Sequence, residues 1–240
     1  MGRPFMGRQC DRSRCSHAAA RRDARVTFAY SFEMYAIQLI GSAVFAMTGV
    51  LAVSRRGLDV VGALVLGAVT AVGGGTVRDL LMRYPIFWFG DFNYLWAALA
   101  GAISAFFLSA VVRNTYRGLL YLDGLGAALF AIAATDKAIV EAGLSAPIAV
   151  ILGVVTGIGG GLLRDVLAGR PTLLMSREIY ATPILLGCTL HVMLRDVPSL
   201  VPQAAAISTI FIFALRAVAI RAHLEMPAVL VQRHPTGHDS

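Results

Sequence analysis

Two pairs of adjacent, oppositely charged residues stand near the ends of strongly apolar segments, Arg78-Asp79 and Arg164-Asp165. Each pair follows three consecutive glycines, so Arg78 comes about 5 Å of helix after Gly75. Ionisable side chains at hydrocarbon depth are costly, and they face the protein interior or water. These residues therefore form either a structural lock of ion pairs or part of a gate or substrate site, and both interpretations stand.

The partners of the two arginines are expected elsewhere in the chain. Adjacent residues on a helix point about 100° apart, so Arg78 is not expected to pair with Asp79. Pairs between the two segments, or pairs with Asp123, are the alternatives. Asp123 is the only charge in the apolar run 118–135. It lies either in the headgroup region without a role or beside one of the arginines.

The two glycine runs predict interruptions of their helices. They comprise Gly73, Gly74, Gly75, Gly159, Gly160 and Gly161. Each glycine costs about 1 kcal/mol in a helix interior, and backbone groups freed within a membrane must be satisfied by protein or by water in a cavity. We therefore expect broken helices that line a path, with close helix packing as the alternative. Thr70 and Thr156, one turn earlier, would line that path or bond to the carbonyl four residues back.

These features belong to an internal repeat. Residues 66–81 and 152–167 are identical at ten of sixteen positions, at an offset of 86 residues. Two further matches keep the same offset, Pro85 with Pro171 and Tyr94 with Tyr180. The chain is therefore predicted to be a duplicated unit. If each unit crosses the membrane three times, the second unit is inverted relative to the first, as in many transport proteins.

Composition sets the class of protein. Of the 240 residues, 57% are hydrophobic and 15% charged, with a mean hydropathy of +0.70, whereas about 25% of residues are charged in a typical soluble domain. This excludes a disordered chain and a nucleic-acid-binding tail, and it disfavours a soluble enzyme. The sequence contains no nucleophile–base pair, metal-ligand spacing or phosphate-binding loop pattern. We expect an integral membrane protein that is not an enzyme and has no cofactor.

Seven apolar runs are long enough to be membrane spans. They are 34–54, 60–77, 92–112, 118–135, 142–163, 179–194 and 197–215. The predicted fold is an all-α integral membrane protein with seven transmembrane helices, in two inverted three-helix repeats plus a seventh helix, with helices two and five broken at the glycines. The expected parts are a basic extension (1–32), two repeats (33–117 and 118–196), a seventh helix (197–221) and a cytoplasmic tail (222–240). The extension is interpreted as disordered, or as lying upstream of a true start near Met34; a basic cytosolic arm is the alternative.

The chain resembles the prokaryotic trimeric intracellular cation (TRIC) channel family. Three features carry this resemblance: the repeated LGxxTxxGGGxxRDxL motif, the proline four residues after each copy, and the stretch from Arg177 to Pro183. Bacterial members of this family are also labelled glycine transporter domain proteins. The resemblance covers roughly residues 34–220. It implies a homotrimer in the bacterial inner membrane, with one potassium-conducting pore in each protomer.

Local chemistry allows two functions. In a passive cation channel, carbonyls at the ends of half-helices would offer oxygens to a monovalent cation, and the arginines would limit leak. In a carrier for a small zwitterion such as glycine, Arg78 and Arg164 would bind the carboxylate. The residues alone do not choose between them, and the family resemblance favours the channel. A scaffold without transport activity is the third class.

Loop charge predicts the orientation. The connections after spans 1, 3 and 5, with the C-terminal tail, carry nine arginines, whereas the other connections carry three basic residues. Basic loops stay in the cytoplasm, so the C-terminus is expected there and the N-terminus outside. The basic residues of 1–32 point the other way, and we give the loops more weight. A reporter fused after residue 221 should report cytoplasm; a periplasmic signal would overturn the orientation.

Overall fold

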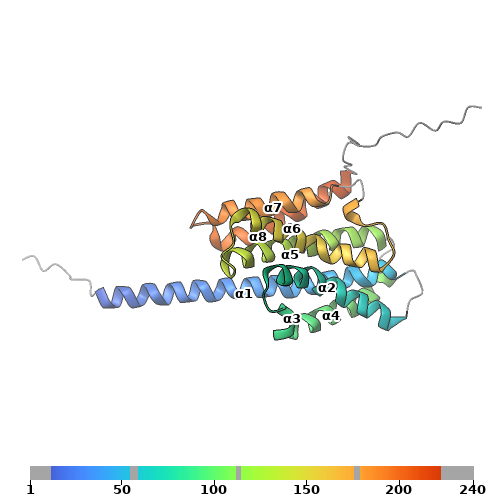
Figure 1. Cartoon of the computed structure of the whole chain (residues 1–240), viewed down its shortest axis with the longest axis horizontal. Helices are drawn as coiled ribbons and strands as arrows, with labels where there is room; N and C mark the ends of the chain where they lie inside the picture. Colours follow the sequence, from blue (N-terminus) through green and yellow to red (C-terminus); the bar gives the residue numbers. More distant parts are fainter. Residues whose placement is uncertain (1–11, 55–58, 112–114, 176–178, 223–240) are drawn as a thin grey trace, which may run out of the picture.

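The computed structural model describes residues 12–54, 59–111, 115–175 and 179–222, with side chains from Phe32 onward in the first helix and up to Phe107 in the fourth. This part of the chain is all-helical (Figure 1). Its elements are α1 (Arg12–Val53), α2 (Val60–Met82), α3 (Phe87–Gly90), α4 (Asn93–Val111), α5 (Thr115–Val140), α6 (Ala146–Leu167), the 3-10 helix η1 (Leu173–Met175), α7 (Ala181–Arg195) and α8 (Val201–Ala222).

Five helices are long and apolar enough to cross a membrane. They include the Phe32–Val53 part of α1, together with α2, α5, α6 and α8. The two remaining expected spans coincide with shorter apolar helices, Asn93–Phe107 and Ala181–Arg195. The protein is therefore an all-helical membrane protein in which every apolar run of the sequence forms a helix.

The first helix begins earlier than expected. Residues 12–32, which the sequence analysis interpreted as a disordered extension, continue α1 as helix and project from the end of the bundle (Figure 1). Residues 1–11 and 223–240, which complete the expected extension and tail, lie outside the described part of the chain. The described chain enters at one end of the bundle and leaves at the other (Figure 1), as an odd number of crossings requires.

Helix α5 forms the centre of the bundle. Its most apolar window is 78% buried inside the protein, whereas α2, α6 and α8 are 44% buried and turn more of their surface outward. It packs against α1, α6, α7 and α8. The described surface carries many large apolar side chains, among them Trp96 and Phe107, as expected where lipid is the solvent.

The two repeats fold alike. Helices α2 and α6 end in the same hydrogen bonds, since Tyr84 N–H donates to the Asp79 carbonyl at 2.9 Å and Arg170 N–H to the Asp165 carbonyl at 2.8 Å. A left-handed residue follows each helix, with φ of 56° at Arg83, directly after α2, and at Gly169, two residues after the end of α6. These equivalences keep the 86-residue offset of the sequence repeat.

Helices α2 and α6 cross in opposite directions at the glycines. A Cβ atom added to Gly74 would lie 2.3 Å from the Thr156 carbonyl oxygen and 3.1 Å from Gly160 N, and one added to Gly160 would lie 2.6 Å from the Thr70 carbonyl oxygen. Later residues of one helix thus meet earlier residues of the other, which is an antiparallel crossing. The second repeat is inverted relative to the first at this contact.

The expected break of helices two and five is wrong. Helices α2 and α6 run without interruption through both glycine runs. The glycines instead remove the side chains that would hold the two backbones apart, so the backbones come close enough for dispersion contacts to offset the low helix propensity of glycine. Close packing, the alternative interpretation of the glycine runs, is the one that the structure supports.

We expect Gly74→Ala and Gly160→Ala to destabilise the protein, because the added methyl group meets backbone that cannot move aside. The expected loss in free energy of unfolding is about 1–3 kcal/mol for each variant. Thermal unfolding in detergent, followed by circular dichroism, measures it. Gly90→Ala is the matched control, because nothing lies within 4 Å of a Cβ there; equal stability of all variants would contradict the close crossing.

Candidate functional site

One buried cluster surrounds Arg164 and is called here the α6 cluster: Thr48, Asp123, Arg164 and Asp165. Arg164 Nη1 donates to Asp123 Oδ1 at 2.7 Å and to Thr48 Oγ1 at 3.1 Å, while its Nε donates to Asp165 Oδ1 at 2.9 Å. The other oxygen of Asp165 accepts the Leu173 N–H at 3.1 Å. Arg164 is fully buried, so two carboxylates and a hydroxyl compensate one buried guanidinium.

Tyr180 and Arg216 lie next to the α6 cluster. The Arg216 guanidinium lies 4.7 Å from the centre of the Tyr180 ring, and its Nη1 donates to the Ile179 carbonyl at 2.8 Å. A Cβ added to Gly161 would lie 2.8 Å from Asp123 Oδ1 and 3.1 Å from the Tyr180 hydroxyl, so glycine leaves the space that these polar groups occupy. Within the described residues, Asp123 Oδ2, the Tyr180 hydroxyl and Arg216 Nε have no hydrogen-bond partner.

A smaller cluster surrounds Arg78 and is called here the α2 cluster: Arg78, Asp79, Phe87 and Lys137. Arg78 Nε donates to Asp79 Oδ1 at 2.9 Å, and Lys137 Nζ donates to the same oxygen at 3.1 Å. Asp79 Oδ2 accepts the Phe87 N–H at 2.9 Å, and the Arg78 guanidinium lies 5.5 Å from the centre of the Phe87 ring. One buried carboxylate, that of Asp79, therefore forms ion pairs with two cations.

The prediction about pairing is partly wrong and partly confirmed. Both arginines do pair with the adjacent aspartate through Nε, because a long arginine side chain can fold back across the 100° between neighbouring positions. The expected pair between Asp123 and an arginine is confirmed at Arg164. The pair between the two repeats is also present, but Lys137 supplies its cation in place of an arginine.

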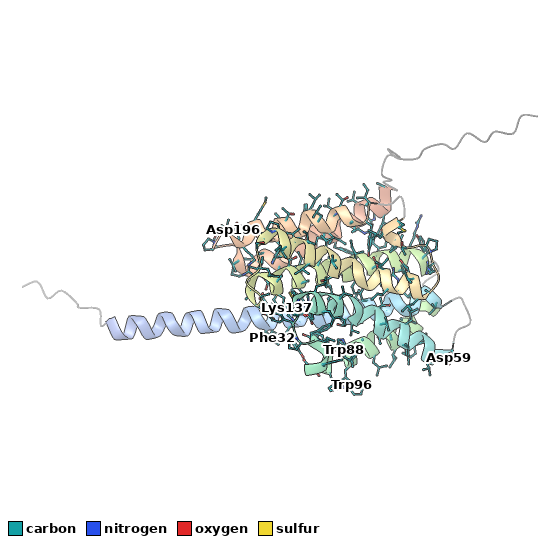
Figure 2. All side chains as sticks on the ribbon, in the orientation of Figure 1. Phe32, Asp59, Trp88, Trp96, Lys137 and Asp196 are labelled. Atoms are coloured by element: carbon teal, nitrogen blue, oxygen red, sulfur yellow. The ribbon has the colours of Figure 1, made fainter. Side chains whose placement is uncertain are left out.

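The two clusters lie toward opposite ends of the bundle. Figure 2 shows Lys137 at the same end as Phe32, with Asp59, the residue before α2, at the other end. Because α2 and α6 are antiparallel, Arg164 lies toward the Asp59 end. Between the clusters is the glycine crossing, where Phe45 is buried against Gly126 and Gly160 and stacks on Phe130 with ring centres 5.4 Å apart.

A cavity of about 290 Å³ opens at the Lys137 end. Its lining residues are Met34, Tyr35, Gln38, Tyr94, Asp136, Val140 and Glu141. Asp136 pairs with Arg195 and lies 3.3 Å from the Nε2 atom of the buried His191, and Glu141 lies 3.9 Å from Lys137 Nζ. The cavity thus joins α1, α4 and α5 around two carboxylates that each have a cationic partner.

A third carboxylate lies close to this cavity. The Tyr35 hydroxyl donates to Asp91 Oδ2 at 2.6 Å, and the Asn93 N–H donates to Asp91 Oδ1 at 2.9 Å. These hydrogen bonds hold the pKa of the Asp91 carboxyl below its ordinary value. Asp91 therefore stays ionised at neutral pH and keeps this end of the bundle attractive to cations.

The two threonines bond within their own helices. Thr70 Oγ1 donates to the Leu66 carbonyl at 2.7 Å, and Thr156 Oγ1 to the Leu152 carbonyl at 2.6 Å. Both side chains are fully buried. Of the two roles considered from the sequence, the structure supports the bond to the carbonyl four residues back.

Sequence reasoning missed several residues of the site. Lys137 and Arg216 were assigned to connections, yet Lys137 is part of α5 and Arg216 is buried in α8. Without these two residues, the connections after spans 1, 3 and 5 and the C-terminal tail carry eight basic residues, and the other connections carry two. The expected orientation therefore keeps its support. The apolar residues 217–220 that follow Arg216 were a usable signal that its helix continues. Thr48 had none, because its partner is 116 residues away.

Comparison with known proteins agrees with this architecture. The sequence profile of the glycine transporter family matches residues 35–110 and 120–196. The UPF0126 inner membrane protein YadS of Escherichia coli K12 is 38% identical over 198 residues, which cover 81% of this chain and 95% of YadS. A crystal structure of the TRIC trimeric intracellular cation channel orthologue from Rhodobacter sphaeroides superposes with a TM-score of 0.75 at 37% identity, covering 80% of this chain and 98% of the orthologue.

A second solved structure, from work on conductance through TRIC cation channels, gives a TM-score of 0.69 at 30% identity, with 80% of this chain and 94% of the other covered. The fold and its two buried charge clusters define a polytopic helical membrane protein of TRIC-like architecture. The chain belongs to the glycine transporter (UPF0126) family, which shares its fold with the prokaryotic TRIC channels.

We expect Asp123 and Arg164 to be strongly coupled. Asp123→Asn leaves the buried Arg164 with only Asp165 as anionic partner and should lower the free energy of unfolding by about 3–5 kcal/mol. The double variant Asp123→Asn with Arg164→Gln should cost less than the sum of the single variants. Thermal unfolding in detergent measures the cycle. Asp196→Asn, at an exposed carboxylate, is the control and should change stability by less than about 0.5 kcal/mol; strictly additive losses would contradict the pair.

Proposed function

We propose that the protein is a passive channel for monovalent cations, chiefly potassium, with one pore within each protomer. The observation that carries this proposal is the likeness to the Rhodobacter sphaeroides TRIC orthologue, at 37% identity and a TM-score of 0.75 over 98% of that chain. The family name alone would favour glycine as the substrate. The solved structures that this chain resembles are described as cation channels, so the channel is the better supported function.

The proposed path runs from the cavity at the Lys137 end, past the glycine crossing, to the α6 cluster. Charged and polar side chains at both ends are buried inside the protein, as expected for groups beside an aqueous path. Phe45 and Phe130 lie at the crossing and form an apolar constriction. Apolar constrictions close pores by excluding water, so we assign the closed state of the path to Phe45.

Three further features belong to the same proposal. The bacterial inner membrane is the expected location, because YadS is described as an inner membrane protein. The loop charges favour an external N-terminus and a cytoplasmic C-terminus. A homotrimer is expected because the Rhodobacter sphaeroides orthologue is described as trimeric. The expected domain limits, 33–117 and 118–196 for the repeats, are retained as proposals.

Flux into liposomes that hold the purified protein tests the function. We expect potassium flux down its gradient, with no uptake of labelled glycine above that of protein-free liposomes. Accumulation of glycine without potassium flux would favour the carrier.

Phe45→Ala should raise the potassium flux, because removal of the ring widens the constriction. Phe32→Ala is the matched control, since Phe32 is 64% exposed in the middle of α1, and it should leave the flux unchanged. Unfolding of Phe45→Ala must be checked, because large-to-small core changes cost about 3–5 kcal/mol.

A further inference from the structure

The two arginines of the repeat have unequal partners. Arg164 Nη1 donates to Asp123 and Thr48. At the offset of 86, the residue equivalent to Asp123 is Ile37, and the residue equivalent to Thr48 is Ala134. The two positions equivalent to the partners of Arg164 therefore carry apolar residues. Among the described residues, neither Nη1 nor Nη2 of Arg78 has a hydrogen-bond partner, although Arg78 is fully buried.

The α2 cluster also lacks a negative charge. Arg78 and Lys137 share a single oxygen of Asp79, and the other oxygen is taken by the Phe87 N–H. Glu141, 3.9 Å from Lys137, is 56% exposed and contributes a screened charge at the rim. By contrast, Arg164 has two carboxylates within hydrogen-bond distance. The α2 cluster therefore holds two cations and one buried anion, a combination that is costly unless a further anion is present.

We propose that Arg78 is a binding site for a small monovalent anion, either a halide or the carboxylate of a small solute. Nη1 and Nη2 form the side of a planar fork that has no partner among the described residues. This geometry accepts a carboxylate with two parallel hydrogen bonds, or a halide between two N–H groups. The bound anion supplies in the first repeat the charge that Asp123 supplies in the second.

Access to this site is from the cavity at the Lys137 end. The Phe87 ring lies under the Arg78 guanidinium at 5.5 Å and packs edge-on against Tyr94, with ring centres 4.7 Å apart. Tyr94 lines the cavity, so a single ring separates the cavity wall from the arginine. Both carboxylates that line the cavity pair with cations, Asp136 with Arg195 and Glu141 with Lys137. The charge of nearby Asp91 opposes the entry of an anion, but both of its oxygens already accept hydrogen bonds, from Tyr35 and Asn93.

Thermal unfolding of the purified full chain in chloride, bromide, acetate or gluconate, at constant potassium and ionic strength, tests the site without relying on conduction. An anion that binds only the folded protein raises its Tm, by about 5–10 °C at a hundred times its Kd. We expect a saturable rise with bromide or chloride over gluconate, which is a carboxylate but carries a hydroxylated six-carbon chain much larger than the small solutes proposed for the site. An equal rise with acetate assigns a carboxylate site, and a rise with halide alone assigns a halide site; both support the proposal.

Variants separate this site from general salt effects. Arg78→Gln should abolish the anion-dependent rise, and Arg78→Lys should reduce it, because a point charge does not reproduce the fork. Arg221→Gln removes an exposed cation of α8 and should leave the rise intact. A rise that persists in Arg78→Gln, or no rise in the unaltered protein, overturns the proposal. If Arg78→Gln does not fold, crystals of the unaltered protein in bromide decide: anomalous density beside Arg78 supports the site, and its absence overturns it.

A second arm rests on the proposed function. An unoccupied Arg78 leaves a net positive charge beside the path and repels cations, so potassium current in planar bilayers should fall when gluconate replaces chloride at constant potassium. The current through Arg78→Gln should not depend on the anion. Current that is anion-independent in both proteins would show that the bound anion does not control conduction. It would overturn this arm, while the Tm measurements decide the site itself.

Discussion

Compensation of buried arginine charge is the constraint on which the rest of the structure depends. A guanidinium buried among apolar helices must be paired and hydrogen-bonded, because an uncompensated ion in that environment costs several kcal/mol. Arg164 satisfies this through α1, α5 and its own helix, so one side chain joins three helices at one end of the bundle. Arg78 and Lys137 join α2 and α5 at the other end through Asp79. These few contacts join helices that are far apart in the sequence.

The glycine crossing makes these charge clusters possible. Because Gly74 and Gly160 leave no side chain between the backbones, α2 and α6 approach closely at the middle of the bundle. The charged pairs lie a few residues later in each helix and so diverge toward opposite ends. Phe45 fills the remaining space at the crossing. A tight, apolar centre with charged ends follows directly from where the motif places its glycines and its arginine.

Inverted duplication gives two sites of the same shape but different charge. Both repeats keep the adjacent aspartate, the N–H donated eight residues later, and the left-handed helix end. They differ where each arginine reaches outside its own helix, to Asp123 and Thr48 in one repeat and to no described partner in the other. The two ends of the proposed path therefore differ in their ion pairs: Arg164 pairs with two carboxylates, whereas Arg78 and Lys137 share Asp79.

The sequence by itself determined the class of protein, the positions of its apolar helices, the duplication and its inversion, because these depend on hydropathy and on a repeat that can be counted. It also placed Arg78 and Arg164 at hydrocarbon depth, whereas for Asp123 it left both the headgroup region and a place beside an arginine; the structure buries all three. Tertiary structure alone decided whether the glycines break a helix or bring two together, because both outcomes use the same residues, and the close approach of α6 selects packing. It also decided the partners: Thr48, Lys137 and Arg216 join the site only because distant helices pack side by side, and local sequence carries no record of that contact.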